Sequence, residues 1–287
     1  MSDHTFERER ARLRGLAYRM LGEVSAAEDV VQEAWIRWNQ AQGVRNPAAW
    51  LNTVVTRLCL DELGSARSRR ETYVGPWLPE PLPTDEPAQP GEMAESLSMA
   101  FLVLLEHLTP PQRAAFLLRD VFDYDMAEVA EILGTSADNA RQLASRARRH
   151  VQQGRPRFDA PGPAVDALVM RFGVACLTGD LEGLVQSLSE DATLWSDGGG
   201  VVHAAARPIR GPKYIAKFLL GIVRIRGAMT PPKMMWVNGQ PGAIFFEDGR
   251  VESALVLDIS DSKVVGVRIV RNPNKLTHLA AQPTPAD

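Results

Sequence analysis

The sequence predicts a multidomain chain in which two all-α units precede an α+β domain, and three observations support this prediction. Apolar residues recur with helical spacing over residues 7–70 and again over 100–153. Residues 125–149 have the pattern of two short helices joined by a glycine turn. Beyond residue 233, short runs with β character alternate with turn signals. A length of 287 residues is enough for two or three compact domains.

The first helical unit is expected to contain three helices. Gly22 ends the first apolar stripe, and Ser25 with Glu28 three residues later has the pattern of a capping box for the second helix. Pro47 favours the start of a third helix, because its missing N–H is not needed in the first turn. This third helix is expected to end in a basic stretch that contains Arg67, Arg69 and Arg70.

A proline-rich segment separates the two helical units. Its prolines, between residues 71 and 93, exclude regular structure. From Glu71 to Gln112 the chain has no Lys or Arg but several carboxylates, which indicates an acidic, extended linker. A plain disordered spacer is the alternative. Trp77, flanked by Leu78 and Pro79, favours a segment that docks on another part of the protein.

The helix-turn-helix pattern is the most informative feature of the chain. Gly134 can take the positive φ that ends its first helix, and Ser136 can cap the second. The exposed face of the second helix then carries side chains that suit base edges and phosphates. These are Ser136, Asn139, Arg141, Gln142, Ser145, Arg146 and Arg148. An ordinary helical hairpin with a solvated basic face is the alternative, but the arginines that continue to Arg157 favour DNA.

The C-terminal part is expected to form an α+β domain after a second linker at residues 156–163. Helices are predicted at 164–179, 181–188 and 211–222, and strands at 234–237, 243–247, 251–259 and 263–270. The turn signals between these strands are Asn238-Gly239, Asp248-Gly249 and Asp261-Ser262. The pattern predicts helices first and a curved antiparallel sheet after them.

Composition bounds the class of protein. The net charge of −3 is small, and Cys59 and Cys176 are far apart in apolar surroundings, which favours reduced core thiols. No Cys/His cluster indicates a metal, and we expect no metal site, no cofactor and no catalytic residue. The charged N-terminus does not resemble a signal peptide, and no apolar run suits a membrane span. We therefore expect a cytoplasmic protein without a membrane partner.

Several segments together resemble a known family. Tyr18-Arg19-Met20-Leu21-Gly22 followed by residues 27–37 resembles the core-polymerase-binding segment of bacterial sigma factors, and the helix-turn-helix resembles their −35-reading domain. Residues 77–81, 197–200 and 272–276 resemble signatures of one subgroup. That subgroup comprises extracytoplasmic-function sigma factors fused to a C-terminal SnoaL-like domain, an α+β fold with the shape of a cone. The resemblance covers nearly the whole chain.

The resemblance implies a domain organisation and two partners, core RNA polymerase and promoter DNA. It assigns residues 1–73 to sigma region 2, 74–98 to an acidic linker, 99–155 to sigma region 4 and 164–280 to the SnoaL-like domain. The polymerase-binding candidates, which share one face of a helix, are Asp29, Gln32 and Glu33. The −10 candidates at the third helix are Asn52, Arg57, Arg67, Arg69 and Arg70. Residues 44–46 are a guess for the loop that captures a flipped base.

The subgroup signatures suggest regulation by the chain's own C-terminal domain. The candidate regulatory residues are Trp77, Leu78, Pro79, Glu80, Pro81, Asp197, Gly198, Gly199, Gly200, Asn272, Pro273, Lys275 and Leu276. We expect the loops at 197–200 and 272–276 to project from the sheet domain, and Lys275 to complement Glu80. The domain would then pack on the linker and hold the two sigma regions close together.

A pocket enzyme with a DNA-binding module is the alternative function. Relatives of the SnoaL-like fold include isomerases and cyclases, and a small-molecule ligand in the C-terminal pocket is conceivable. The candidates for such chemistry are Trp195, Asp197, His203, Arg207 and Arg210. One histidine near one carboxylate is weak support for acid–base catalysis, and a fold does not imply a function.

Overall fold

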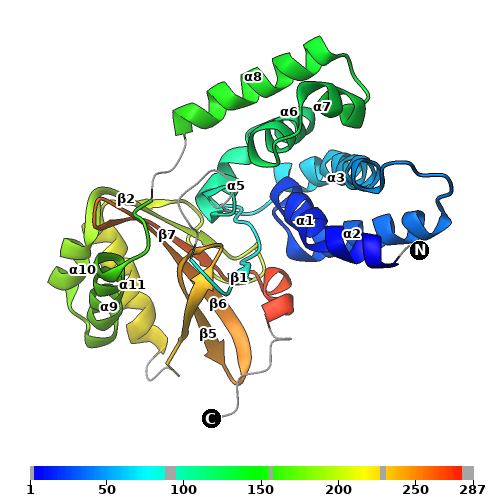
Figure 1. The fold of residues 1–287 in the computed structure, drawn as a ribbon. Helices are drawn as coiled ribbons and strands as arrows, with labels where there is room; N and C mark the ends of the chain where they lie inside the picture. Colours follow the sequence, from blue (N-terminus) through cyan, green and yellow to red (C-terminus); the bar gives the residue numbers. More distant parts are fainter. Residues whose placement is uncertain (1–2, 88–94, 155–157, 227–230, 280–287) are drawn as a thin grey trace. The chain divides into compact units, whose positions relative to one another are not determined.

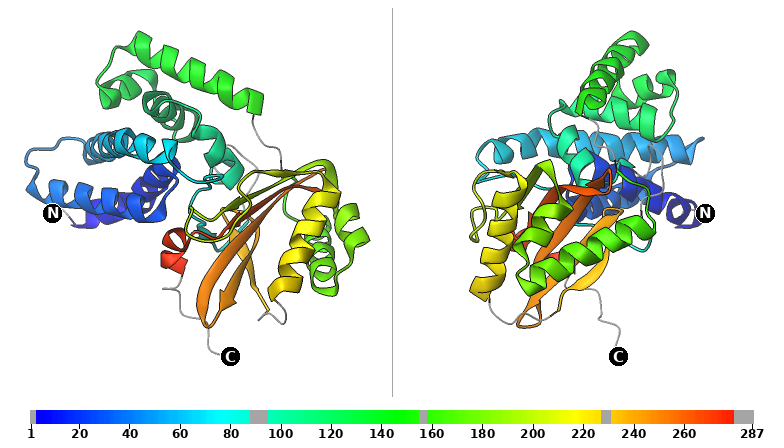
Figure 2. Two further views of the ribbon diagram at one scale, coloured as in Figure 1. Left: turned by 180° about the vertical axis from the view of Figure 1, so that it is seen from behind. Right: turned by 90° about the vertical axis from the view of Figure 1, so that its left-hand side faces the viewer.

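The computed structural model divides the chain into two compact units. It describes residues 3–87, 95–154, 158–226 and 231–279, without the side chains of 3, 66–71 and 226. We call residues 3–72 and 101–154 the helical unit, and residues 73–100 and 158–279 the sheet unit. Each unit is described by itself. Figures 1 and 2 show the elements of both.

The first half of the helical unit contains the three expected helices, α1 (Asp3–Leu21), α2 (Val24–Gln40) and α3 (Pro47–Glu71). Gly22 adopts a φ of 71° directly after α1, so the predicted break is confirmed. The predicted cap at Ser25 is wrong: α2 begins at Val24, which places Ser25 inside the first turn. The apolar stripes of the three helices pack on one another, and Leu13, Met20, Ala34 and Leu51 are fully buried.

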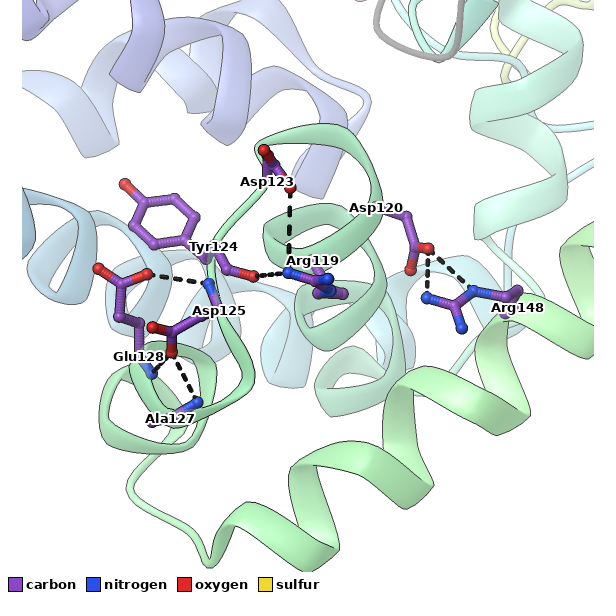
Figure 3. A network of polar contacts seen from close by, with 8 residues as sticks. All are labelled: Arg119, Asp120, Asp123, Tyr124, Asp125, Ala127, Glu128 and Arg148. Atoms are coloured by element: carbon purple, nitrogen blue, oxygen red, sulfur yellow. Dashed lines mark hydrogen bonds and ion pairs between the residues drawn. The ribbon is translucent and has the colours of Figure 1, made fainter.

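The second half of the helical unit contains α5 (Met99–Leu105), α6 (Pro110–Phe116), the π-helix η1 (Leu117–Val121), α7 (Met126–Leu133) and α8 (Ala137–Gly154). Asp125 caps α7 by accepting hydrogen bonds from the N–H groups of Ala127 and Glu128, both at 2.8 Å (Figure 3). Glu128 accepts in turn from the Asp125 N–H, which completes a capping box.

The predicted turn between the two reading helices is confirmed. Gly134 has φ 63° and ψ 38°, the left-handed conformation that ends α7 without a steric penalty. The Ser136 hydroxyl accepts a hydrogen bond from the Asn139 N–H at 3.2 Å and so caps α8. Residues 126–154 therefore form a helix-turn-helix with a long second helix.

The sheet unit contains three helices on one face of a seven-stranded sheet (Figures 1 and 2). The helices are α9 (Pro163–Thr178), α10 (Leu181–Ser187) and α11 (Pro212–Arg226). The strands are β1 (Pro83–Thr84), β2 (Leu188–Asp197), β3 (Ile209–Arg210), β4 (Lys233–Val237), β5 (Gln240–Glu247), β6 (Arg250–Ser260) and β7 (Lys263–Val270). Their order across the sheet is β1-β4-β5-β6-β7-β2-β3. Leu194, Val264 and Val267 pack between sheet and helices.

Two features of this sheet differ from the prediction. Strand β2 was missed, and it pairs with β7 in parallel, so the sheet is mixed and not wholly antiparallel. Strands β2 and β3 also precede α11, so the helices do not all come first. A parallel neighbour is brought in by a distant part of the chain, which no local turn signal reports.

The predicted turns between β4, β5, β6 and β7 are confirmed. Asn238-Gly239, Asp248-Gly249 and Asp261-Ser262 all have positive φ, between 51° and 73°. Two consecutive left-handed residues match the twist of a two-residue hairpin. These turns fix the register of the antiparallel part of the sheet.

The segment predicted as an irregular linker belongs to the sheet unit. Residues 83–84 form β1, which pairs with β4 through Pro83–Val237 and Thr84–Trp236, so regular structure is not excluded there. Proline is tolerated because β1 is an edge strand. Leu78, Ser96 and Met99 are buried. The expectation that this segment docks is thus confirmed, and a plain spacer is excluded for its described residues.

Two glycines of the sheet unit give a matched test of its packing. A Cβ on Gly242 would lie 2.9 Å from the Leu255 carbonyl oxygen, whereas a Cβ on Gly173 in α9 would meet open space. We expect Gly242→Ala to destabilise the unit by about 1–3 kcal/mol through overpacking. Gly173→Ala should stabilise it by roughly 0.5–1 kcal/mol, because glycine is unfavourable within a helix.

Hydrogen–deuterium exchange of the β5 and β6 amides would measure both effects in the full chain. Equal exchange in the two variants would contradict the packing at Gly242.

Candidate functional site

The outer face of α8 carries the predicted DNA-reading side chains. Ala140, Ala144, Ala147 and Val151 are buried against the rest of the helical unit. All seven candidates on the other side are exposed, namely Ser136, Asn139, Arg141, Gln142, Ser145, Arg146 and Arg148. The helix therefore presents a continuous polar and basic surface that suits a DNA major groove.

The arginines on this surface are not equivalent. Arg148 donates from Nε (2.9 Å) and Nη2 (2.5 Å) to Asp120 of η1, which fixes its guanidinium within the unit (Figure 3). Arg141 pairs with Asp138 one turn earlier, at 2.5 Å, and both side chains are largely exposed. An exposed pair of this kind is weak and can exchange for a phosphate or a base. Arg148 is thus partly a structural residue, which the sequence pattern did not indicate.

The predicted polymerase-binding face lies on α2. Asp29 and Gln32 are exposed, and Glu33 is half-exposed with a 2.7 Å ion pair to Arg37. Trp35, on the same helix, is 41% exposed. Ile36 next to it is 40% exposed. This part of α2 therefore joins acidic and large apolar surface, the composition of a protein-binding site.

The −10 candidates on α3 differ in accessibility. Arg57 is exposed. Asn52 is only 1% exposed: its amide donates to the Ala48 carbonyl and accepts from Arg12, so it cannot contact DNA in this conformation. The side chains of Arg67, Arg69 and Arg70 lie outside the described residues. Residues 44–46 form the loop between α2 and α3, and the Asn46 side chain accepts a hydrogen bond from the Ala49 N–H.

A buried carboxylate gathers the candidate regulatory residues in the sheet unit. Asp197, at the end of β2, is fully buried. It accepts hydrogen bonds from the Tyr73 hydroxyl at 2.6 Å, the Leu78 N–H at 2.8 Å and the Lys275 ammonium at 2.8 Å. The expectation that residues 197–200 and 272–276 project as loops is therefore wrong. Asp197, Asn272 and Lys275 are buried and hold residues 73–78.

Lys275 lies in a cage of aromatic rings. Its Nζ is 4.8 Å from the centre of the Tyr73 ring and 4.3 Å from that of Trp77, and it donates to the Leu78 carbonyl at 2.5 Å. The predicted Lys275–Glu80 pair is wrong, because Lys275 pairs with Asp197. Glu80 lies 3.8 Å from His278, whose other ring nitrogen contacts the Pro81 carbonyl. Sequence spacing could not decide between two acidic partners that are both far from Lys275 along the chain.

The segments on both sides of residues 101–155 are attached to the sheet unit. Asn238 accepts from the Leu82 N–H at 2.9 Å and donates to the Leu97 carbonyl at 2.9 Å. After the helix-turn-helix, the Asp159 carboxylate accepts from the N–H groups of Asp261 and Ser262 in the β6–β7 turn. The Asn238 contacts agree with the predicted packing of the C-terminal domain on the linker. The Asp159 attachment was not predicted, since an aspartate in a linker gives no sign of its partner.

The candidates for enzyme chemistry do not converge. His203, Arg207 and Arg210 are exposed, and the Asp197 carboxylate is already occupied by Tyr73, Leu78 and Lys275. Arg268 is buried with Asp258 and under the Trp195 ring, and burial lowers its pKa to about 9. A hollow of about 100 Å³, lined by Glu95, Trp236 and Gln240 among others, is smaller than a usual ligand pocket.

Two further searches cover the part of the chain that the structure describes. Within it, no three His, Cys, Asp or Glu side chains are grouped so that they could hold a metal ion. Within the same residues, none of the helices combines the length and apolarity needed to cross a membrane. Cys59 is buried, which raises the pKa of its thiol, and burial raises that of Cys176 to about 12.

Comparison with known proteins follows the same division of the chain. Residues 5–69 match the model of Sigma-70 region 2, and residues 98–151 match that of Sigma-70, region 4. The ECF RNA polymerase sigma factor SigJ of Mycobacterium tuberculosis is 42% identical over 97% of this chain and 96% of its own. The probable ECF RNA polymerase sigma factor SigI of the same organism is 31% identical over 95% of this chain and 94% of its own.

A solved structure supports the assignment through the whole length. The crystal structure of the Mycobacterium tuberculosis extracytoplasmic function sigma factor SigJ aligns with a TM-score of 0.76 and 39% identity, covering 96% of this chain and 98% of that one. Both helical halves and the sheet unit therefore have counterparts in one relative. The chain belongs to the ECF RNA polymerase sigma factors.

Proposed function

We propose that this chain binds core RNA polymerase and directs transcription initiation from a specific promoter, under the control of its own C-terminal domain. The observation that carries this proposal is the exposed polar and basic face of α8 on a helix-turn-helix of sigma region 4. Region 2 supplies the polymerase face on α2 and the −10-reading part of α3. Because a chain with this function binds RNA polymerase, we propose that it is located in the cytoplasm.

We expect reversal of charge on α2 to weaken polymerase binding. In the variant Asp29→Lys with Glu33→Lys, the acidic stripe becomes basic beside Trp35 and would repel a basic partner. We expect the affinity for core polymerase to fall by tenfold or more, on the order of 1.4 kcal/mol per tenfold. Competition binding with labelled wild-type chain measures it.

Glu182→Lys with Glu190→Lys is the matched control, because it reverses two exposed charges in the sheet unit. If both double variants bind polymerase like the wild type, α2 is not the docking face.

We expect the residues of α8 to separate into two groups in promoter binding. Gln142→Ala or Arg141→Ala should cost about 1–3 kcal/mol and relax the preference at one base pair. Arg146→Ala should weaken all sequences alike and lower the salt dependence, as loss of a phosphate contact does. Gln152→Ala, exposed but beyond the reading turns, is the control. Reconstituted transcription on a promoter library would test this, and unchanged sequence preference in all variants would exclude α8 as the reader.

The regulatory part of the proposal rests on the two segments that flank region 4 in the chain, because both are attached to the sheet unit. Residues 73–84 are held by Asp197 and Lys275, and residue 159 is held by the β6–β7 turn. Region 4 lies between these segments in the chain. The C-terminal domain can therefore restrict where region 4 reaches while both segments stay docked. A fused domain of this kind acts at a high effective concentration.

We expect Lys275→Met to release residues 73–84. Removing one partner of a buried ion pair leaves the other charge uncompensated, at a cost of about 3–5 kcal/mol. Amide exchange in residues 73–84 should then accelerate, and transcription should change in the same variant. Lys217→Met removes an exposed lysine of α11 and serves as the control. Equal exchange in the two variants would show that the Asp197–Lys275 pair does not hold the segment.

A pocket enzyme or ligand sensor is the second candidate, and the sheet unit gives it less support. The side chains between helices and sheet are apolar and closely packed, and the hollow beside Glu95 is small. A pull-down with core polymerase separates the two candidates, because an enzyme would have no reason to bind it.

A further inference from the structure

Three arginines connect the two halves of the helical unit. Region 2 contributes Arg12 and Arg19 from α1, and region 4 contributes Arg113 from α6. Each guanidinium meets the other region at aromatic rings or at a main-chain carbonyl. None of these residues belongs to the helix-turn-helix surface, to the α2 face or to the linker contacts described above.

Arg12 makes the contact at the entrance to α7. Its guanidinium donates to the Tyr124 hydroxyl of region 4 and, at 3.1 Å, to the Asn52 side-chain oxygen of region 2. It also lies 5.2 Å from the centre of the Tyr124 ring and 5.9 Å from that of Phe122. Arg19, also on α1, contacts the same Phe122 ring: its guanidinium lies 5.8 Å from the ring centre, and the residue is 8% exposed. The loop 122–124 is thus held by two cations of α1.

Arg113 of region 4 makes the second contact, with the end of α1 in region 2. It is 3% exposed, pairs with Glu106 at 2.7 Å and donates to the Leu105 carbonyl, all within region 4. Its Nη1, which also pairs with Glu106, donates at 2.6 Å to the carbonyl of Met20, in the last turn of α1. Burial lowers the pKa of Arg113 to about 10, so it remains charged at neutral pH. A cation is favourable at a helix C-terminus, where carbonyls are unsatisfied.

The closed arrangement is too small to read a promoter. The positions that give the −35 and −10 elements their names are about 25 base pairs apart. This is a distance on the order of 80 Å, at roughly 3.4 Å per base pair. A compact body of about 125 residues has a radius of gyration of about 14 Å and a diameter of roughly 36 Å. Regions 2 and 4 must therefore separate before both elements can be bound.

We propose that Arg12 and Arg113 form a latch within the sigma unit that keeps regions 2 and 4 together until polymerase or DNA separates them. Arg12 both holds Tyr124 and occupies the side-chain oxygen of Asn52, the −10 candidate. Opening the latch lets regions 2 and 4 reach the distance that separates the two promoter elements, whereas the Arg12–Asn52 bond lies within region 2. The inference rests on the proposed function for its biological meaning, but the latch itself can be measured without transcription.

The latch also differs from control by the C-terminal domain, because its bonds lie wholly within the helical unit. The closed state would persist after the linker is released, unless the arginines are changed as well. Two independent restraints of this kind bias one equilibrium between closed and open forms.

Spin-label distances in the full chain test the proposal. Labels at Asn39→Cys on α2 and Gln152→Cys on α8 report the separation of the two regions, and both positions are exposed. Cys176 is replaced by serine, and Cys59 is inaccessible because it is fully buried. The test variants are Arg12→Gln and Tyr124→Phe, the second of which removes the acceptor and keeps the ring. Arg12→Gln with Arg113→Met removes both contacts.

Arg10→Gln is the matched control. Arg10 and Arg12 lie on α1 and each pairs at 3.3 Å with a glutamate three residues earlier, but among the described residues Arg10 makes no hydrogen bond or ion pair with region 4. We expect one narrow, short distance in the wild type and in Arg10→Gln. Each single latch variant should raise the open-to-closed ratio by roughly tenfold, as loss of one charge-assisted hydrogen bond does. The double variant should be mainly open.

Two outcomes would overturn the proposal. One is a double variant with the wild-type distance distribution and unchanged helix content. The other is a shift of equal size in Arg10→Gln. If the double variant loses helix content, Tyr124→Phe decides, since a ring without its hydroxyl leaves the packing intact. If the latch variants open but transcription does not change, the latch proposal stands and the result counts against the proposed function.

Discussion

The sheet unit depends on one buried negative charge. Asp197 is removed from water at the end of β2, and an ionised carboxylate is tolerated there only when all its hydrogen-bonding capacity is used. Its two oxygens receive a hydroxyl, an ammonium and two main-chain N–H groups, from Leu78 and Gly199. Its own carbonyl accepts from the N–H groups of Arg271 and Asn272. One residue thereby joins the segment at 73–78, the turn at 198–200 and the chain after β7.

The identity of the neighbouring residues follows from this charge. A Cβ on Gly199 would collide with the Asn272 side chain, so the turn after Asp197 is closed only with glycine. Asn272 donates to the Tyr73 hydroxyl, and Lys275 supplies the compensating positive charge between two aromatic faces. Motifs that lie between 78 and 197 residues apart in the sequence are thus parts of one buried polar cluster. Such a cluster is stable only while every member is satisfied.

The helical unit also contains a buried charge, but this charge is positive. Arg113 is a buried cation, and it is satisfied by two main-chain carbonyls and by Glu106. In both units, then, at least one partner of the buried charge is far away in sequence, Leu78 and Lys275 for Asp197 and Met20 for Arg113. Contacts of this kind are strong when complete and costly when one partner is lost, which makes each suitable as a restraint that opens all at once.

The sequence by itself determined the local structure and the family. Gly134, Asp125 and the two-residue turns after β4 and β6 act through the backbone of their own neighbours, so their consequences could be predicted from spacing alone. The face of α8 followed from the helical period for the same reason. The motifs 77–81, 197–200 and 272–276 could be singled out as residues that belong together, because they resemble signatures of one subgroup of the family.

Only the tertiary structure decided which distant groups meet. It paired β2 with β7 in parallel, gave Lys275 to Asp197 in place of Glu80, and covered Asn52 with Arg12. It also turned Trp35 outward and fixed Arg148 on Asp120. Each of these outcomes depends on a partner that the fold brings close, and the energy of a buried pair depends on which residue that partner is. Local sequence patterns carry no information about the partner, whereas the packing of a whole unit allows only one partner for each buried group.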